Sequence, residues 1–123
     1  MLLEIIDMKI LLTISMLIVS NIFMTIAWYG HLKWFNKWNL LWVILISWSF
    51  ALVEYMFQVP ANKIGFEGNN GPFSLVQLKV VQEVITLVVF SVFSVIVFNS
   101  KLTTNHIIGF CFLILAVYFI FKK

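Results

Sequence analysis

The stretch MKILLTISMLIVSNIFMTIAWYG, residues 8–30, decides the fold of this chain. Lys9 is its one charged residue, and its length meets the ~20 apolar residues that a helix needs to cross the hydrocarbon core of a bilayer. Similar runs cover residues 40–58, 75–98 and 102–121. Backbone groups in lipid must be hydrogen-bonded within the protein, and the alternation of a barrel strand is missing. The sequence therefore predicts an all-α integral membrane protein, an antiparallel bundle of four transmembrane helices.

The composition agrees with a membrane protein. Only 11% of the 123 residues are charged and 63% are hydrophobic, whereas a soluble domain carries roughly 25% charged residues. The length fits one transmembrane domain over residues 1–123. All eight basic residues are lysines scattered along the chain, so we expect no nucleic-acid partner. The lipid bilayer is the expected surrounding.

The connections predict the topology. The links between the first two runs and between the last two are short, which makes those helices antiparallel neighbours. The segment from Val59 to Ser74 is the one substantial loop, because Pro60 is expected to end the second helix and three glycines follow it. Both termini then lie on one side. A small excess of lysines on that side favours a cytoplasmic location for the termini.

Polar residues inside the second and third runs form the candidate site. Glu54 lies one helical turn before Gln58, and on the third run Lys79 precedes Glu83 by four residues, on the same helix face. Counted from the loop that the two runs share, the two glutamates should lie at comparable depth, about two turns into the membrane. The polar residues on one face of each helix should face those of the other helix or a water-filled cleft.

Two interpretations of these residues remain open. As structural groups, Lys79 would neutralise an acid while glutamines supply hydrogen bonds between the helices. As functional groups, one acid would bind a proton or a cationic substrate. Lys79 can satisfy Glu83 locally, so Glu54 is the acid expected to lack a permanent partner.

The first run and its end add further candidates. Ser20, Asn21 and Thr25 are expected to bond within their helix or to a neighbouring helix. Aromatic residues cluster near Tyr29, as an interfacial belt or as a cation-binding surface. His31 is either a proton carrier or an ordinary interfacial histidine. The full set of candidate substrate- or proton-binding residues is Glu54, Glu83, Lys79, Gln58, Gln82, Gln77, Asn62, Asn21, Tyr29 and His31.

Motifs of soluble enzymes do not occur in the sequence. It has no glycine-rich phosphate loop, no HExxH and no GxSxG. Cys111 is a single cysteine in an apolar run, which provides neither a disulfide nor a metal-ligand pair. We therefore expect no enzyme activity, no catalytic or metal-binding residues and no cofactor.

Three stretches resemble a known family: SNIFMTIAWYGHLKW (residues 20–34), SWSFALVEYMFQVPANKIGF (47–66) and FSLVQLKVVQEVITLVVFSVF (73–93). AWYGH, EYxxQVPAN and QLKxxQE are their most specific parts. The sequence is similar, from about residue 20 to 121, to small four-helix bacterial membrane proteins of unknown function within the drug/metabolite transporter (DMT) superfamily. A distant similarity extends to the small multidrug resistance proteins.

The resemblance implies a secondary transporter of the bacterial inner membrane that works as a homodimer on a small-molecule or cationic substrate. Small multidrug resistance proteins carry an essential glutamate in their first helix, but this chain has no acid between Asp7 and His31. Any proton coupling must therefore use Glu54 or Glu83. The alternative function is a non-transporting scaffold or a small subunit of a larger membrane complex.

Overall fold

The computed structural model describes residues 1–122, and its secondary structure is helical apart from one isolated bridge in a loop. The elements are α1 (Leu2–Thr25), η1 (Ile26–Gly30), α2 (His31–Trp34), α3 (Leu40–Gly65), η2 (Glu67–Asn69), α4 (Leu75–Phe98) and α5 (Thr104–Phe121). Because α1, η1 and α2 are continuous, the described chain has four helical rods long and apolar enough to cross a membrane. The predicted fold class is confirmed.

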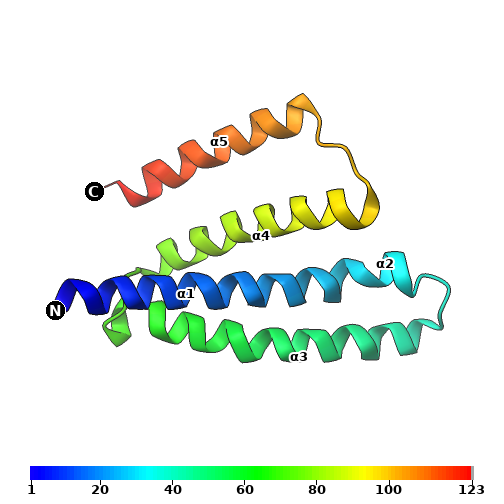
Figure 1. Cartoon of the computed structure of the whole chain (residues 1–123), viewed down its shortest axis with the longest axis horizontal. Helices are drawn as coiled ribbons and strands as arrows, with labels where there is room; N and C mark the ends of the chain where they lie inside the picture. Colours follow the sequence, from blue (N-terminus) through cyan, green and yellow to red (C-terminus); the bar gives the residue numbers. More distant parts are fainter. Residues whose placement is uncertain (123) are drawn as a thin grey trace.

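The helices lie side by side in the order α3, α1, α4, α5 (Figure 1). Each membrane-crossing rod runs opposite to the rod that precedes it in sequence, so α1 begins and α5 ends at the same end of the molecule (Figure 1). The most extensive contact is that of α1 with α3, and α5 packs on α4. The arrangement is therefore an open layer, with α1 at its centre.

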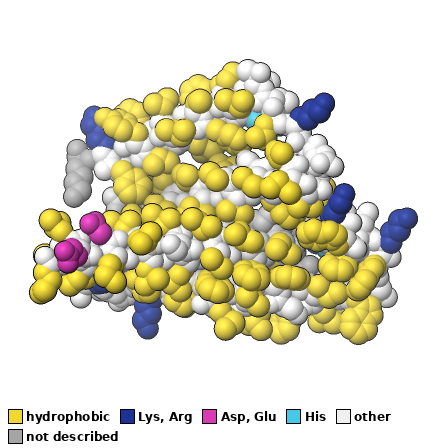
Figure 2. Space-filling model, viewed as in Figure 1, with side chains coloured by type: hydrophobic (Ala, Val, Ile, Leu, Met, Phe, Trp, Pro, Cys, Tyr) yellow, Lys and Arg dark blue, Asp and Glu magenta, His cyan; other side chains and the backbone are white. Residues whose placement is uncertain are grey.

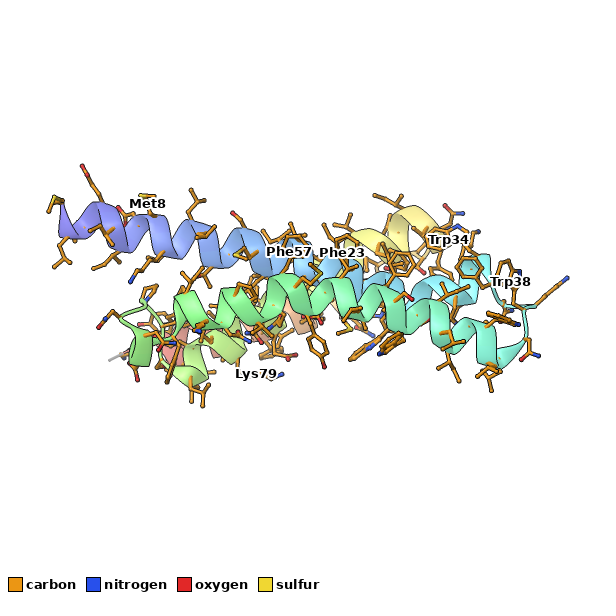
Figure 3. The ribbon with its side chains drawn as sticks, turned by 90° about the horizontal axis from the view of Figure 1, so that it is seen from below. Met8, Phe23, Trp34, Trp38, Phe57 and Lys79 are labelled. Atoms are coloured by element: carbon orange, nitrogen blue, oxygen red, sulfur yellow. The ribbon has the colours of Figure 1, made fainter. Side chains whose placement is uncertain are left out.

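Interhelical packing concentrates along the contact of α1 with α3. Leu17 and Ala61 are completely buried, and the rings of Phe23 and Phe57 stack with centroids 6.1 Å apart (Figure 3). Outside this contact most of the large apolar side chains are exposed, with Leu78 and Phe73 as buried exceptions. Hydrophobic side chains cover most of the face in Figure 2, with the charged groups gathered mainly toward its two ends, as expected for a surface in contact with lipid.

Pro60 does not end the second membrane helix, so the boundary expected at Gln58 was wrong. α3 continues to Gly65 and the loop is reduced to residues 66–74. A proline removes one backbone hydrogen bond, a loss that membrane helices tolerate. The following turn is retained because Phe66 N–H donates to the Asn62 carbonyl and the Asn69 side chain donates to the Lys63 carbonyl.

The outer helices also differ in their bounds. α1 begins at Leu2 rather than Met8, and its rod runs past Gly30 to Trp34. α5 begins at Thr104 rather than at residue 102, because the Thr103 side chain accepts a hydrogen bond from the His106 backbone and caps the helix. The bounds expected for α4 agree with the structure.

The loop after α3 is a compact turn. Phe66 and Phe73 pair through their backbones, with Phe73 N–H donating to the Gly65 carbonyl at 2.9 Å. A Cβ on Gly71 would lie 2.4 Å from the carbonyl carbon of Gly65 and 2.4 Å from the Ile64 carbonyl oxygen. Only glycine fits where one backbone lies so close to another. Lys9 of α1 donates to the Asn70 carbonyl at 2.9 Å and fastens the turn to the N-terminal part of α1.

Replacing Gly71 by Ala should destabilise the protein, because the added methyl group meets backbone that cannot move aside. We expect the free energy of unfolding to fall by about 1–3 kcal/mol, the usual cost of overpacking. Thermal unfolding in detergent measures it. Gly109→Ala is the matched control, since a Cβ at Gly109 has nothing within 4 Å. Equal melting temperatures for the two variants would contradict the proposed packing of the turn.

Candidate functional site

A cleft of about 500 Å³ lies among α1, α3 and α4, at the level where their polar residues meet. Both glutamates predicted from the sequence line it, together with the predicted lysine, two glutamines and aromatic residues. The lining residues are Asn21, Met24, Thr25, Trp28, Tyr29, Glu54, Gln58, Lys79, Gln82, Glu83, Thr86, Leu87 and Phe90. The polar residues of α3 and α4 therefore share one cavity with the C-terminal end of α1 and with η1.

Glu54 is the most buried ionisable side chain of the cleft, with 3% of its surface exposed. Its Oε1 lies 2.8 Å from the Ser20 hydroxyl of α1, which also lies 2.7 Å from the Gln58 Oε1. The other carboxylate oxygen, Oε2, is buried without a hydrogen-bond partner in residues 1–122. Half of the hydrogen-bonding capacity of this acid is therefore unused within the described chain.

The Ser20 hydroxyl has one hydrogen, yet it contacts two oxygen atoms. A hydroxyl donates one hydrogen bond at a time, so one of its two neighbours must donate to it. Glu54 supplies that hydrogen as a neutral acid, or Gln58 supplies it when its amide is turned to present its NH₂ group. The same three side chains can thus hydrogen-bond either form of Glu54.

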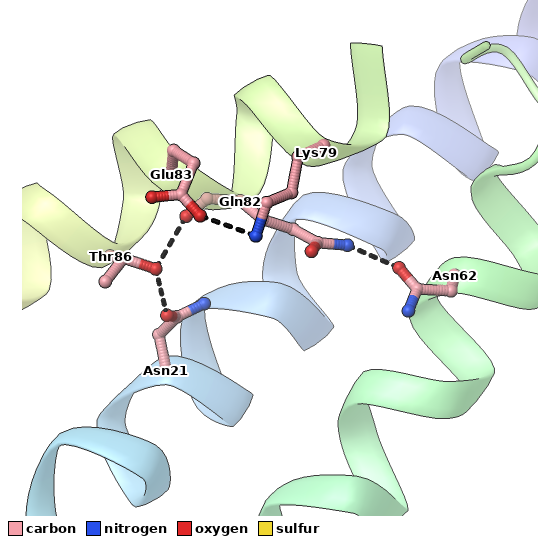
Figure 4. Close-up of polar contacts among 6 residues, drawn as sticks. All are labelled: Asn21, Asn62, Lys79, Gln82, Glu83 and Thr86. Atoms are coloured by element: carbon pink, nitrogen blue, oxygen red, sulfur yellow. Dashed lines mark hydrogen bonds and ion pairs between the residues drawn. The ribbon is translucent and has the colours of Figure 1, made fainter. Parts of the chain in front are cut away.

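Glu83 has the partner that Glu54 lacks. Lys79 Nζ lies 2.7 Å from Glu83 Oε1, one turn along α4 (Figure 4). These side chains are 71% and 57% exposed in the isolated chain, so the ion pair lies at the open side of the cleft. No lysine pairs with Glu54 in the described chain. The cleft therefore holds two acids, of which one is neutralised.

Amides and hydroxyls connect the helices around the cleft. Gln82 of α4 donates to the Asn62 side chain of α3 (Figure 4). The Thr86 hydroxyl of α4 lies 2.6 Å from Asn21 Oδ1 and 2.7 Å from the Gln82 carbonyl. Asn21 donates in turn to the Leu17 carbonyl at 2.8 Å. This network joins α4 to both α1 and α3.

Aromatic rings form the end of the cleft away from the loop. Tyr29 and Phe90 meet edge to face with centroids 5.0 Å apart, and Trp28 packs on Tyr29 at 6.2 Å. Trp28 and Tyr29 belong to η1, whose π-helical turn shifts the register of the rod at this point. Such turns are frequent at functional sites. The cleft therefore has an acidic part and an aromatic part.

Glu54 lies deeper than the expected two turns, because α3 extends to Gly65. At ~1.5 Å per residue it is about 16 Å from the end of α3, while Glu83 is about 12 Å from the start of α4. Glu54 therefore lies close to the middle of the 26-residue α3. Membrane transporters typically bind substrates and coupling ions near the middle of the bilayer.

Three predicted residues lie outside the cleft lining, and one of them, Asn62, lines a separate cavity on the loop side. Gln77 forms a capping box with Ser74, and its Oε1 accepts from the Ser74 backbone N–H at 3.0 Å. A residue in the first turn of a helix is well placed to cap it, which explains why Gln77 does not reach inward. His31 begins α2, beyond the aromatic end of the cleft.

Ser20 is the direct partner of Glu54, although it was not among the predicted site residues. Its neighbour Asn21 was a candidate, and the pair SN in the middle of an apolar run was the available signal. Thr25 bonds within its own helix as expected, donating to the Asn21 carbonyl at 2.7 Å. Facing helices, rather than spacing within one helix, bring Ser20 to Glu54.

The family comparison identifies the chain. Residues 13–121 match the family model described as "Putative member of DMT superfamily (DUF486)". The chain belongs to this family. The resemblance inferred from its motifs is thus confirmed, and members of the DMT superfamily are generally transporters rather than enzymes. Comparisons with curated proteins and with solved structures gave no match.

A double-mutant cycle on Asn21 and Thr86 should reveal coupling between α1 and α4. Asn21→Ala and Thr86→Val each remove one side of the 2.6 Å contact, so their effects on the free energy of unfolding should not add. We expect a coupling energy of about 0.6 kcal/mol, the average for interhelical hydrogen bonds in membranes, where the largest values reach about 1.7 kcal/mol. Unfolding in detergent measures the cycle. A parallel cycle of Asn21 with Ser49, whose hydroxyl bonds to its own helix, should show no coupling.

Proposed function

We propose that this member of the DMT superfamily is a secondary transporter in which Glu54 binds the coupling proton or a cationic group of the substrate. One observation carries the proposal: Glu54 is buried in the wall of a polar cleft, with Oε2 unpaired and no cation bound to it in the described chain. An acid without a partner in a membrane is costly, and such residues commonly mark ion or substrate pathways.

The geometry supports exchange at this carboxyl group. As a neutral acid, Glu54 can donate to Ser20, which then donates to Gln58. As a carboxylate, it can accept from Ser20 and offer its free Oε2 to a cation in the cleft. A proton and a cation would then compete for one carboxyl group, which is the requirement for coupling their movements in opposite directions. The substrate we propose is a small organic cation with an apolar part, because aromatic rings can bind such a group through cation–π contact.

Replacing Glu54 by Gln should abolish proton-coupled transport, because the amide cannot exchange a proton. The protein is reconstituted into vesicles with a pH gradient, and an internal pH dye reports proton movement as small organic cations are added. We expect at least a tenfold lower rate for Glu54→Gln. Glu67→Gln is the control, because Glu67 lies in the exposed turn. Wild-type rates in Glu54→Gln vesicles would refute the assignment of Glu54.

The scaffold alternative also has an observation in its favour. Lys79 neutralises Glu83, and hydrogen bonds join α4 to both α1 and α3, as polar contacts that only specify packing would. The same vesicles distinguish the two functions. A scaffold gives no cation-dependent proton movement in the wild type, although Glu54→Gln changes its stability.

We also propose that two copies of the chain enclose the transport path. The helices form an open layer in which α5 packs mainly on α4 (Figure 1). The exposed Lys79–Glu83 pair would face lipid in a lone copy, at a substantial energetic cost. A second copy over this side of the cleft removes both charged groups from lipid. We place the dimer in the bacterial inner membrane with cytoplasmic termini.

The dimer is tested by counting subunits. Single-molecule photobleaching of a dye-labelled protein in dilute vesicles should show two bleaching steps. Gln82 lines the cleft beside the ion pair, so the large side chain of Gln82→Trp should obstruct the second copy. The number of bleaching steps should then shift from two toward one. Ile114→Trp is the control, because Ile114 lines the apolar groove between α4 and α5, whose lining contains neither Lys79 nor Glu83. A single step for the wild type, or loss of the dimer only with the control, would refute the arrangement.

A further inference from the structure

We infer that the last turns of α3, from Pro60 to Gly65, form a gate between the Glu54 cleft and a second cavity on the loop side. The inference rests on the proposed transport function, since it names the contact that would open and close one entrance to the site. It is carried by two cavities with shared walls, one hydrogen bond between them and a proline beside that bond.

The second cavity measures about 580 Å³ and lies between α3 and α4 next to the loop. Lys79 and Gln82 belong to the walls of both cavities. The lining of the second cavity is Val59, Asn62, Lys63, Phe66, Asn69, Leu75, Leu78, Lys79 and Gln82. It reaches exposed residues of the turn, such as Asn69. A route from the loop side to Glu54 would therefore pass Gln82.

The bond between Gln82 and Asn62 lies on this route (Figure 4). Within residues 1–122 it is the one side-chain hydrogen bond that joins α3 to α4. The two helices otherwise contact α1 far more than each other. Breaking this amide–amide bond would remove the one side-chain hydrogen bond that keeps the end of α3 beside α4.

Pro60 supplies the hinge. It lies inside α3, between Gln58 of the cleft and Asn62 of the bond. Proline has no N–H, so the Met56 carbonyl receives no helical hydrogen bond from position 60, and the helix is weakened there. Bending at Pro60 would move Asn62 without displacing Glu54. The hinge therefore separates the moving part of α3 from the binding part.

The moving part ends in a rigid unit. Gly71 packs directly on the backbone of Gly65, so the turn and the end of α3 must move together. Gly65 also lies against Thr13 of α1, whose methyl group is 2.8 Å from an added Cβ. The Thr13 hydroxyl is buried there without a partner in the described chain. Together with the bond from Lys9 to the Asn70 carbonyl, these contacts hold the closed position.

Thiol labelling from the loop side tests the gate. Met24 lines the cleft, so Met24→Cys, in a Cys111→Ser background, reports its accessibility. A membrane-impermeant maleimide is added outside reconstituted vesicles. The fraction of protein molecules whose loop faces outward is measured separately, from the labelling of Glu67→Cys in the exposed turn. We expect Asn62→Ala and Gln82→Ala to raise the rate at position 24 at least tenfold. Pro60→Ala, which restores the helical bond, should lower it.

Two controls separate a gate from general loosening. Thr86→Val removes the contact with Asn21 and leaves the bond between α3 and α4 intact, so it should not change the labelling rate. The double variant Asn62→Gln/Gln82→Asn exchanges the two amide side chains and keeps their summed length. Its labelling rate should equal that of the protein with Met24→Cys alone. Opposite effects of Pro60→Ala and Asn62→Ala cannot both result from misfolding.

The gate is refuted if Asn62→Ala and Gln82→Ala leave the labelling rate unchanged, or if Thr86→Val raises it equally. Labelling requires no transport, so the result is independent of Glu54. Loss of transport in Glu54→Gln together with unchanged labelling in Asn62→Ala would overturn the gate alone. Changed labelling with no proton movement in the wild type would overturn the transporter and leave a moving α3 end.

Discussion

The contact of Glu54 with Ser20 is the constraint on which the rest of the structure depends. It joins α3 to α1 in the middle of their most extensive contact, where water is excluded. A carboxyl group there requires a polar neighbour, because an unpaired polar group in hydrocarbon costs several kcal/mol. The register of α1 against α3 must therefore place a hydroxyl opposite position 54. Phe23 lies three residues after Ser20 and Phe57 three residues after Glu54, and their stacked rings belong to the same contact of α1 with α3.

The polar contacts of α4 complete the cleft without closing it. Thr86 reaches Asn21 of α1, and Gln82 reaches Asn62 of α3. These bonds hold α4 across α1, while the side chains of Lys79 and Glu83 remain largely exposed. Polar side chains of three helices thus line one cavity. A protein that needed only tight packing could fill this region with small apolar residues.

Membrane surroundings explain why so much of the molecule lacks internal packing. None of the residues of α5 is buried, and its surface is almost wholly apolar. In water, an apolar helix with so little packing would not be stable. In lipid, its apolar side chains contact hydrocarbon and its backbone hydrogen bonds are satisfied within the helix. The loose contact of α5 with α4 therefore does not require a large hydrophobic core. It leaves the organisation of the polar cleft to α1, α3 and α4.

The sequence by itself determined the four membrane helices, their alternating direction and the pairing of Lys79 with Glu83. These follow from length, apolar composition and helical spacing, which are local properties. It also singled out Glu54 as an acid with no cation in its own helix. The tertiary structure decided that α3 passes through Pro60, that Gln77 caps α4 and that Ser20 meets Glu54. The contact of Ser20 with Glu54 depends on which helix faces which, because a buried carboxyl group is tolerated only where a neighbour compensates for it. The cap formed by Gln77 is local to Ser74, three residues before it.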